Sequence, residues 1–151
     1  MKIVFADVDG VLVNRQSFRL PRMKCASIEP TVNTAFPACV RNLNRIIKET
    51  QAKIVISSTW RLLGVKAMRE IFERWGVEGD IIGRTPELRG SDRGIEIEQW
   101  LATCGHDIES FVILDDDADM NGLSARLVQT NFTYGLTARD ATRAIELLKA
   151  A

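Results

Sequence analysis

The sequence predicts an α/β fold, in the form of a three-layer, Rossmann-like arrangement around a mainly parallel sheet. Short apolar runs typical of buried strands alternate with longer segments of helical periodicity, which is the pattern of successive βαβ units. The three strongest runs end in polar residues, as expected where a ligand crevice forms at the carboxyl ends of parallel strands. With 151 residues and no repeat or linker, the chain is expected to form a single domain over residues 1–151.

Five apolar runs are predicted strands. Three are strong, namely Lys2–Ala6, Lys53–Ile56 and residues 111–114, because each is short, almost wholly apolar and followed directly by polar residues. Two weaker strands are expected at residues 81–82 and 126–129.

Four segments carry apolar residues at helical spacing and are predicted helices. Their apolar positions are Val40, Leu43, Ile46 and Ile47; Met68, Ile71, Phe72 and Trp75; Ile97, Trp100, Leu101 and Cys104; and Ala141, Ala144, Ile145 and Leu148. Gly76 is a suitable cap for the second helix, the third should begin near Arg93, and the last should follow Thr137. Residues 14–36 show no clear period and contain two prolines, so we expect a long loop or partial insertion there.

Composition and charge argue against several classes of protein. Twenty basic and twenty acidic residues give a formal net charge of zero, so any binding to nucleic acid must come from local clusters of charge. Cys25, Cys39 and Cys104 are odd in number and lack CxxC spacing, which disfavours a disulfide framework or a zinc site. The apolar start is too short for a signal peptide or a membrane span, so we expect a cytoplasmic protein without membrane contact.

Acidic residues follow two of the strong strands. Asp7 and Asp9 lie just past the first, and Asp115, Asp116 and Asp119 lie just past the third. Each group taken alone is equally compatible with a turn or a helix N-cap. Together, at neighbouring strand ends, the carboxylates would repel one another unless a cation lay between them. Oxygen ligands without a nearby histidine or cysteine favour a hard cation, and Mg²⁺ is the usual partner when phosphate completes the coordination.

Ser57 follows the second strong strand, where its hydroxyl could donate a hydrogen bond to a phosphoryl oxygen or simply cap the strand end. We do not expect a serine nucleophile, because His106 is the only histidine and no G-x-S-x-G sequence surrounds Ser57.

In their order along the chain these residues resemble the four motifs of the haloacid dehalogenase (HAD) superfamily. The sequence DVDGVL at residues 7–12 resembles the first motif and Ser57 the second. Arg93 stands at the position of the third, and Asp115-Asp116 with Asp119 resembles the fourth. Two details depart from the pattern: Val11 stands where many members have threonine, and Arg89 could serve in place of Arg93.

The resemblance implies a Mg²⁺-dependent phosphohydrolase acting on a phosphomonoester. Asp7 would attack phosphorus and form an aspartyl-phosphate, while Asp9 would protonate the leaving oxygen and later deprotonate water. Ser57 and Arg93 would stabilise the phosphoryl oxygens. The Mg²⁺ ligands would be Asp7, the Asp9 backbone carbonyl and Asp116, supported by Asp115 and Asp119. The spacing of the motifs leaves no room for a large cap domain, so we expect an open site.

A basic segment close to the first motif suggests a polyanionic substrate. Arg15, Arg19, Arg22 and Lys24 fall within ten residues, although a solvated loop face would give the same pattern. Arg61 could add a phosphate contact, and Trp60 could either stack on a base or belong to the core.

The sequences SSTWR at residues 57–61 and RGIEI at residues 93–97 also resemble a narrower group, the capless HAD domains associated with RNA repair and with polynucleotide kinase–phosphatases. This resemblance implies that the substrate is a terminal phosphate on nucleic acid.

Several alternatives remain open at this stage. The same chemistry would serve a small phosphometabolite or a phosphoprotein, and a HAD-like domain could bind a partner without catalysis. A receiver-like signalling domain would have an acidic pair on its first strand and an acceptor aspartate on its third. It fits poorly, because Asp9 follows Asp7 by two residues and the second strong strand ends in Ser57. The oligomeric state, a lid function for residues 14–36 and a kinase or ligase partner are not determined by the sequence.

Overall fold

The computed structural model describes residues 1–26 and 28–150, with residues 29 and 30 described by their backbone alone. Its central sheet consists of five parallel strands in the order β5-β4-β1-β6-β7. These are β1 (Lys2–Ala6), β4 (Lys53–Ile56), β5 (Ile81–Arg84), β6 (Ser110–Asp115) and β7 (Leu127–Gln129). The predicted fold class is confirmed, and both weaker apolar runs are strands, the first of them longer than expected.

Four α-helices cover the sheet: α1 (Pro37–Thr50), α2 (Val65–Trp75), α3 (Arg93–Thr103) and α4 (Ala138–Lys149). Local signals explain two of their ends. Gly76 has a positive φ of 82° and ends α2, because glycine adopts this left-handed conformation without strain. Thr137 and Asp140 form a capping box that begins α4. Short 3₁₀ helices lie between the larger elements: η1 (Arg15–Arg19), η2 (Thr59–Leu63) and η3 (Asn121–Arg126).

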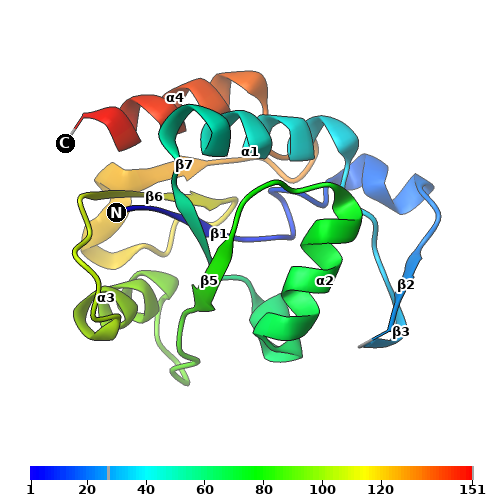
Figure 1. Ribbon diagram of the computed structural model, residues 1–151, viewed down its shortest axis with the longest axis horizontal. Helices are drawn as coiled ribbons and strands as arrows, with labels where there is room; N and C mark the ends of the chain where they lie inside the picture. The colour runs from blue at the N-terminus through cyan, green and yellow to red at the C-terminus, as the bar shows by residue number, and fades with distance from the viewer. Residues whose placement is uncertain (27, 151) are drawn as a thin grey trace.

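The two faces of the sheet bury separate groups of side chains, so the molecule has three layers (Figure 1). Val4 and Ala6 of β1 belong to the larger cluster, which α1, α2 and α4 complete. Ile3 and Phe5 point to the other face, where they pack with Ile97 of α3. Successive side chains of a strand point to opposite faces, and both faces are apolar here because helices cover both.

The register of the sheet brings the ends of the three strongest strands level. Ala6 of β1 pairs with Ile56 of β4 on one side and with Leu114 of β6 on the other. The next residues of the three strands are Asp7, Ser57 and Asp115, which therefore meet at the carboxyl edge of the sheet. The chain continues from β1 to β4 and β5 on one side and returns to β6 on the other, so this edge lies where the strand order reverses.

Residues 14–36 contain more regular structure than the sequence predicted. They form η1 and an antiparallel pair, β2 (Met23–Cys25) and β3 (Ile28–Val32), which corresponds to the predicted partial insertion and not to a long loop; Ser27 lies outside the described residues. Pro21 precedes β2, and Pro30 lies in β3, where the free edge of a two-stranded sheet tolerates proline because no hydrogen-bond ladder is interrupted there. The pair lies beside α2 (Figure 1), where the backbone N–H of Ala26 donates to Glu70 and Arg74 donates to the carbonyl of Lys24.

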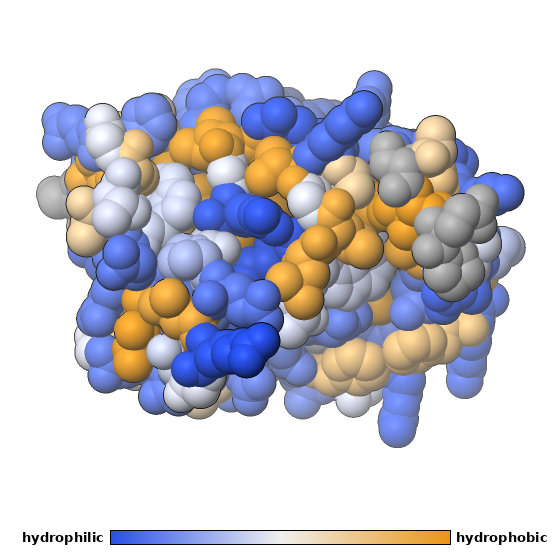
Figure 2. All heavy atoms as spheres, turned by 90° about the horizontal axis from the view of Figure 1, so that it is seen from below, coloured by the Kyte–Doolittle hydropathy of each residue, from blue (hydrophilic) through white to orange (hydrophobic). Residues whose placement is uncertain are grey.

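Figure 2 shows the face of the molecule that lies below the sheet in Figure 1. Hydrophilic side chains divide its hydrophobic surface into separate patches, the usual arrangement on a protein surface. Within the described part of the chain, no helix combines the length and the apolar character that crossing a bilayer requires.

Candidate active site

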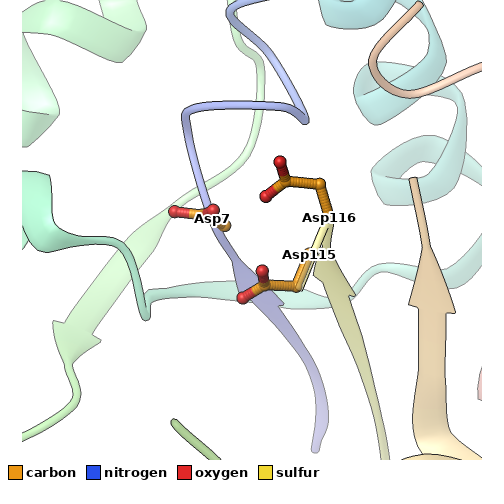
Figure 3. Close-up of side chains that lie close together, drawn as sticks. All are labelled: Asp7, Asp115 and Asp116. Atoms are coloured by element: carbon orange, nitrogen blue, oxygen red, sulfur yellow. The ribbon is translucent and has the colours of Figure 1, made fainter. Parts of the chain in front are cut away.

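Three carboxylates converge at the carboxyl edge of the sheet (Figure 3). Asp7 directly follows β1, Asp115 ends β6, and Asp116 comes next in the chain; one oxygen from each lies within 4.8 Å of the others. Asp7 and Asp115 are buried, with exposures of 6% and 0%, and Asp116 is half-buried. The backbone fixes this convergence, because the N–H of Asp7 donates to the carbonyl of Leu114 at 3.0 Å.

The cluster holds more negative charge than its protein neighbours neutralise. Burial and the charge of Asp7 raise the pKa of Asp115 to about 7, although Arg93 and the N–H of Asp117 act in the opposite direction. Burial, followed by the charge of Asp7, also raises the pKa of Asp116. A divalent cation would remove this repulsion, and three carboxylates without nitrogen or sulfur ligands suit a hard ion such as Mg²⁺. The residues present therefore fit the predicted metal.

Gly10 allows the loop after β1 to pass directly against Asp116. Its φ is +82°, and a Cβ atom built on it would lie 2.3 Å from Cγ of Asp116, so any side chain would displace that carboxylate. The hydroxyl of Thr130 donates to the carbonyl of Gly10 at 2.6 Å and fixes the other side of the loop. The glycine of the DVDG sequence is thus required by both its conformation and its close contact.

Arg93 brings a positive charge to the cluster from the first residue of α3. Its Nη1 lies 3.2 Å from Oδ1 of Asp7 and 2.7 Å from Oδ2 of Asp115. Burial alone would lower the pKa of Arg93, but the charges of Asp7 and Asp115 raise it, so the guanidinium is firmly cationic. Arg89, the alternative that the sequence left open, is exposed in the preceding loop. Of the two arginines, the fold brings Arg93 to the carboxylates.

Asp119 positions this arginine and lies outside the three-carboxylate cluster. Its side chain accepts a hydrogen bond from the backbone N–H of Arg93 at 3.2 Å, and its carbonyl accepts one from Gly94 at 3.1 Å. A Cβ atom at Gly94 would lie 2.1 Å from the carbonyl oxygen of Met120, so glycine permits the close approach of α3 to this loop. Asp119 is exposed, and its predicted metal role stays a prediction.

Asp9 lies two residues beyond Asp7 and faces a different neighbour. Its Oδ2 accepts a hydrogen bond from the indole N–H of Trp60 at 2.9 Å. Burial raises the pKa of Asp9, the Trp60 bond partly lowers it again, and the charge of Asp7 adds to the rise. A carboxyl group with a raised pKa can give and take a proton near neutral pH, which is the property a general acid and base requires.

Ser57 presents an unsatisfied hydroxyl at the same edge. Its backbone N–H donates to the carbonyl of Ala6, while its side chain is 0% exposed and its Oγ has no hydrogen-bond partner among the described residues. Buried hydroxyls are usually hydrogen-bonded, and a free one beside a charged cluster is available for a ligand oxygen. This free hydroxyl is consistent with the phosphoryl contact predicted for Ser57.

The three arginines predicted to bind substrate occupy different environments. Arg61 is buried: its Nη2 lies 2.9 Å from both carboxylate oxygens of Glu96, and its Nη1 donates to the carbonyls of Ser57 and Ser58. In this arrangement it supports the Ser57 loop, and a phosphate contact would require its ion pair to break. Arg15 and Arg19 are exposed on η1.

Some contacts of the site could not be read from the sequence. The hydrogen bond from Trp60 to Asp9 joins residues 51 positions apart, and the pair of Arg61 with Glu96 joins residues 35 apart. The SSTWR and RGIEI sequences contain all but one of these residues, but no local pattern indicates which residues contact each other.

A comparison with protein families identifies the family of the chain. The family model described as the HAD domain in Swiss Army Knife RNA repair proteins matches residues 3–141. The matched stretch contains every residue of the candidate active site, and it confirms the resemblance to capless HAD domains of RNA repair. A search of curated proteins found no match.

Proposed function

Because the chain belongs to the family of HAD domains in Swiss Army Knife RNA repair proteins, we propose that it is a Mg²⁺-dependent phosphomonoesterase that removes terminal phosphates from nucleic acid. One observation carries the proposal. Asp7, Asp115 and Asp116 converge within 4.8 Å beside a cationic Arg93, so a potential nucleophile, a metal site and a phosphate-binding charge coincide.

The first chemical step uses Asp7 as the nucleophile. A carboxylate oxygen attacks phosphorus, a new O–P bond forms the aspartyl-phosphate, and the bond from phosphorus to the substrate oxygen breaks. Arg93, whose Nη1 lies 3.2 Å from Asp7, stabilises the negative charge that spreads over the phosphoryl oxygens. The free hydroxyl of Ser57 donates to one of the same oxygens.

Asp9 carries the proton in both steps. In its protonated form it gives a proton to the departing oxygen, and its raised pKa keeps a share of that form available. It then accepts a proton from the water that attacks phosphorus, so the bond between phosphorus and Asp7 breaks, inorganic phosphate leaves, and both aspartates return to their initial states. Trp60 holds the Asp9 carboxylate through the indole N–H.

Asp7 and Asp116, together with the backbone carbonyl of Asp9, would bind Mg²⁺, while Asp115 and Asp119 support them. When bound, the ion neutralises the carboxylates and draws electron density from the phosphoryl group. Without a cation, the burial that raises the pKa of Asp115 to about 7 would also oppose full ionisation of the cluster.

Two features favour the end of a nucleic acid over a small metabolite. Between β1 and α1 the described residues form only the short 3₁₀ helix η1 and a two-stranded hairpin, so the site can admit the end of a long substrate. Arg15 and Arg19 are exposed near the first motif and suit a phosphate backbone. The name of the family, which refers to RNA repair proteins, is in keeping with this choice.

The test is phosphate release from p-nitrophenyl phosphate and from oligonucleotides with a 3′- or a 5′-phosphate, with and without Mg²⁺. We expect Asp7→Asn to lower turnover of every substrate at least about a thousandfold, because it removes the nucleophile. Asp107→Asn is the matched control, since Asp107 is an exposed aspartate that precedes β6 at the opposite edge of the sheet.

Each result has a defined meaning. Turnover that needs Mg²⁺ and Asp7 supports the chemistry, and a higher kcat/KM for oligonucleotides than for the aryl phosphate supports the substrate. Turnover of the aryl phosphate alone would reject nucleic-acid ends and favour a small phosphometabolite or a phosphoprotein. Full activity of Asp7→Asn would reject the mechanism.

A further inference from the structure

Three aromatic side chains are exposed on two adjoining segments. Phe18 belongs to η1 and is 59% exposed; Phe132 and Tyr134 follow β7 and are 38% and 65% exposed. The rings of Phe18 and Phe132 lie 6.0 Å apart between centroids and are inclined by 32°. Single exposed apolar residues are common, but a group of aromatic rings left in contact with water indicates a binding surface. Tyr134 lies two residues beyond Phe132 in the same turn, between Asn131 and Gly135, and we call these three residues the aromatic surface.

The backbone holds the two segments together, so the aromatic surface is formed in advance. The N–H of Arg15 donates to the carbonyl of Phe132 at 3.0 Å, and Nδ2 of Asn14 donates to the carbonyl of Tyr134 at 3.0 Å. Asn14 is 1% exposed and also caps η1 through its Oδ1. Because these bonds already fix both segments, a ligand would bind the rings without ordering a mobile loop.

The same segments are attached to the catalytic loops. The hydroxyl of Thr130, two residues before Phe132, donates to the carbonyl of Gly10. Nε2 of Gln129 donates to the carbonyl of Asp116 at 3.0 Å, and the N–H of Leu136 donates to the carbonyl of Val11 at 2.8 Å. The aromatic surface therefore adjoins the loops that carry Asp9 and Asp116, on the carboxyl side of the sheet.

Positive charge accompanies the rings. Arg15 and Arg19 lie on the same 3₁₀ helix as Phe18, both are exposed, and neither forms an ion pair with any residue that the structure describes. Uncompensated guanidinium groups beside exposed rings match a ligand that alternates phosphates with flat bases. In single-stranded nucleic acid the bases are free to stack on such rings, whereas in a duplex they are already stacked and paired.

We propose that Phe18, Phe132 and Tyr134 bind the unpaired bases next to the phosphorylated end of a single strand, while Arg15 and Arg19 contact its backbone. This inference rests on the proposed function and deepens it: the substrate class is a single-stranded end. The aromatic surface selects for bases by stacking, which tolerates any sequence, and the carboxylate cluster acts on the terminal phosphate.

The test compares three substrates with the wild-type protein and the Phe18→Ala/Tyr134→Ala variant. The substrates are a short single strand bearing the preferred terminal phosphate, the same strand with abasic sites at the two nucleotides next to that phosphate, and p-nitrophenyl phosphate. We expect the variant to lower kcat/KM for the normal strand by about tenfold or more, relative to the aryl phosphate. Abasic sites should cause a similar loss in the wild-type protein and little further loss in the variant.

A second comparison tests the charges. Arg19→Gln should reduce the salt dependence of oligonucleotide kcat/KM, by about one unit in the slope of log kcat/KM against log salt, because one phosphate contact is lost. Arg143→Gln is the matched control, since Arg143 is an exposed arginine of α4 that pairs with Glu146. An equal change in both variants would overturn the role of Arg19.

The failures can be distinguished. If the wild-type protein hydrolyses the aryl phosphate but no oligonucleotide, the proposed substrate is wrong. If it hydrolyses oligonucleotides and the aromatic variant does so equally well, only the aromatic surface is rejected. A wild-type dimer that the aromatic variant converts to a monomer would identify a second copy of the chain as the occupant, and would also overturn the inference.

Discussion

Arg61 is buried and Arg93 is partly buried at the carboxyl edge of the sheet, and the two arginines lie in opposite electrostatic surroundings. Arg61 faces one carboxylate, Glu96, and its remaining contacts are with neutral carbonyl oxygens. Arg93 faces Asp7 and Asp115, with Asp116 close by. The charges of Arg61 and Glu96 balance each other, whereas the carboxylates around Arg93 carry more negative charge than this one arginine neutralises. A buried ion pair alone therefore does not mark an active site in this molecule; uncompensated charge does.

The surplus of negative charge around Arg93 is suited to binding a cation, whereas Arg61 and Glu96 neutralise each other's charge and leave only the buried Nε of Arg61 without a hydrogen-bond partner among the described residues. Burial raises the pKa values of Asp115 and Asp116 because their charges are not fully neutralised by protein groups. Glu96 also accepts a hydrogen bond from the N–H of Leu88 and so fixes the loop before α3. Removing Arg61 should therefore damage the fold, and removing Arg93 should damage the chemistry.

The largest effect is expected from Arg61→Ala, which leaves the Glu96 carboxylate buried without its partner. We expect the free energy of unfolding to fall by about 3–5 kcal/mol. Chemical denaturation measures this loss. The double variant Arg61→Met/Glu96→Leu should recover most of it, because the unpaired charge is gone. If Arg61→Ala were as stable as the wild-type protein but unable to bind substrate, Arg61 would be a phosphate ligand, as the sequence predicted.

Arg93→Ala should lower kcat/KM for phosphate release by about 10²- to 10³-fold, because a charge that stabilises the transferring phosphoryl group is removed. The free energy of unfolding should fall less than in Arg61→Ala. The carboxylates that lose their partner, Asp7 and Asp115, belong to the cluster whose charge Mg²⁺ can neutralise. Arg89→Ala is the control and should keep wild-type turnover, because Arg89 is exposed and the arginine paired with Asp7 and Asp115 is Arg93. The reverse result for the two variants would assign the third motif to Arg89.

The smallest effect is expected from a neutral hydrogen-bond donor, the indole N–H of Trp60, which can be compared with that of Trp75. Both indoles are partly buried and their rings lie 5.6 Å apart, but Trp60 donates to Asp9 while the Nε1 of Trp75 has no partner among the described residues. The Trp60 bond lowers the pKa of Asp9, so Trp60→Phe should raise it. The loss of activity at alkaline pH, which follows deprotonation of the Asp9 acid, should move to higher pH.

The pH profile of kcat/KM measures this shift, and we expect a loss of about three- to tenfold in kcat from the weaker positioning of Asp9. Trp75→Phe removes an indole N–H of the same kind without touching Asp9, so its profile should match that of the wild-type protein. Identical profiles for Trp60→Phe and the wild-type protein would show that the indole does not position the acid.

The sequence by itself determined the framework of this protein. The strands β1, β4 and β6 and the four helices follow from hydrophobic periodicity, which is a local property of the chain. Because parallel strands end at a common edge, the residues after these strands were predicted to meet, and Asp7, Ser57 and Asp115 do follow strand ends that are level in the sheet. The glycine after Asp9 also indicated a tight loop, although its contact with Asp116 belongs to the tertiary structure.

Only the tertiary structure decided which of the remaining side chains contact each other. It brought Arg93 rather than Arg89 to the carboxylates, paired Arg61 with Glu96, and joined η1 to the segment after β7 more than a hundred residues later. Such contacts depend on how helices and loops pack over the sheet, and packing is set by the shape and volume of the whole core. A periodic pattern records which residues are buried, but it carries no record of their partners.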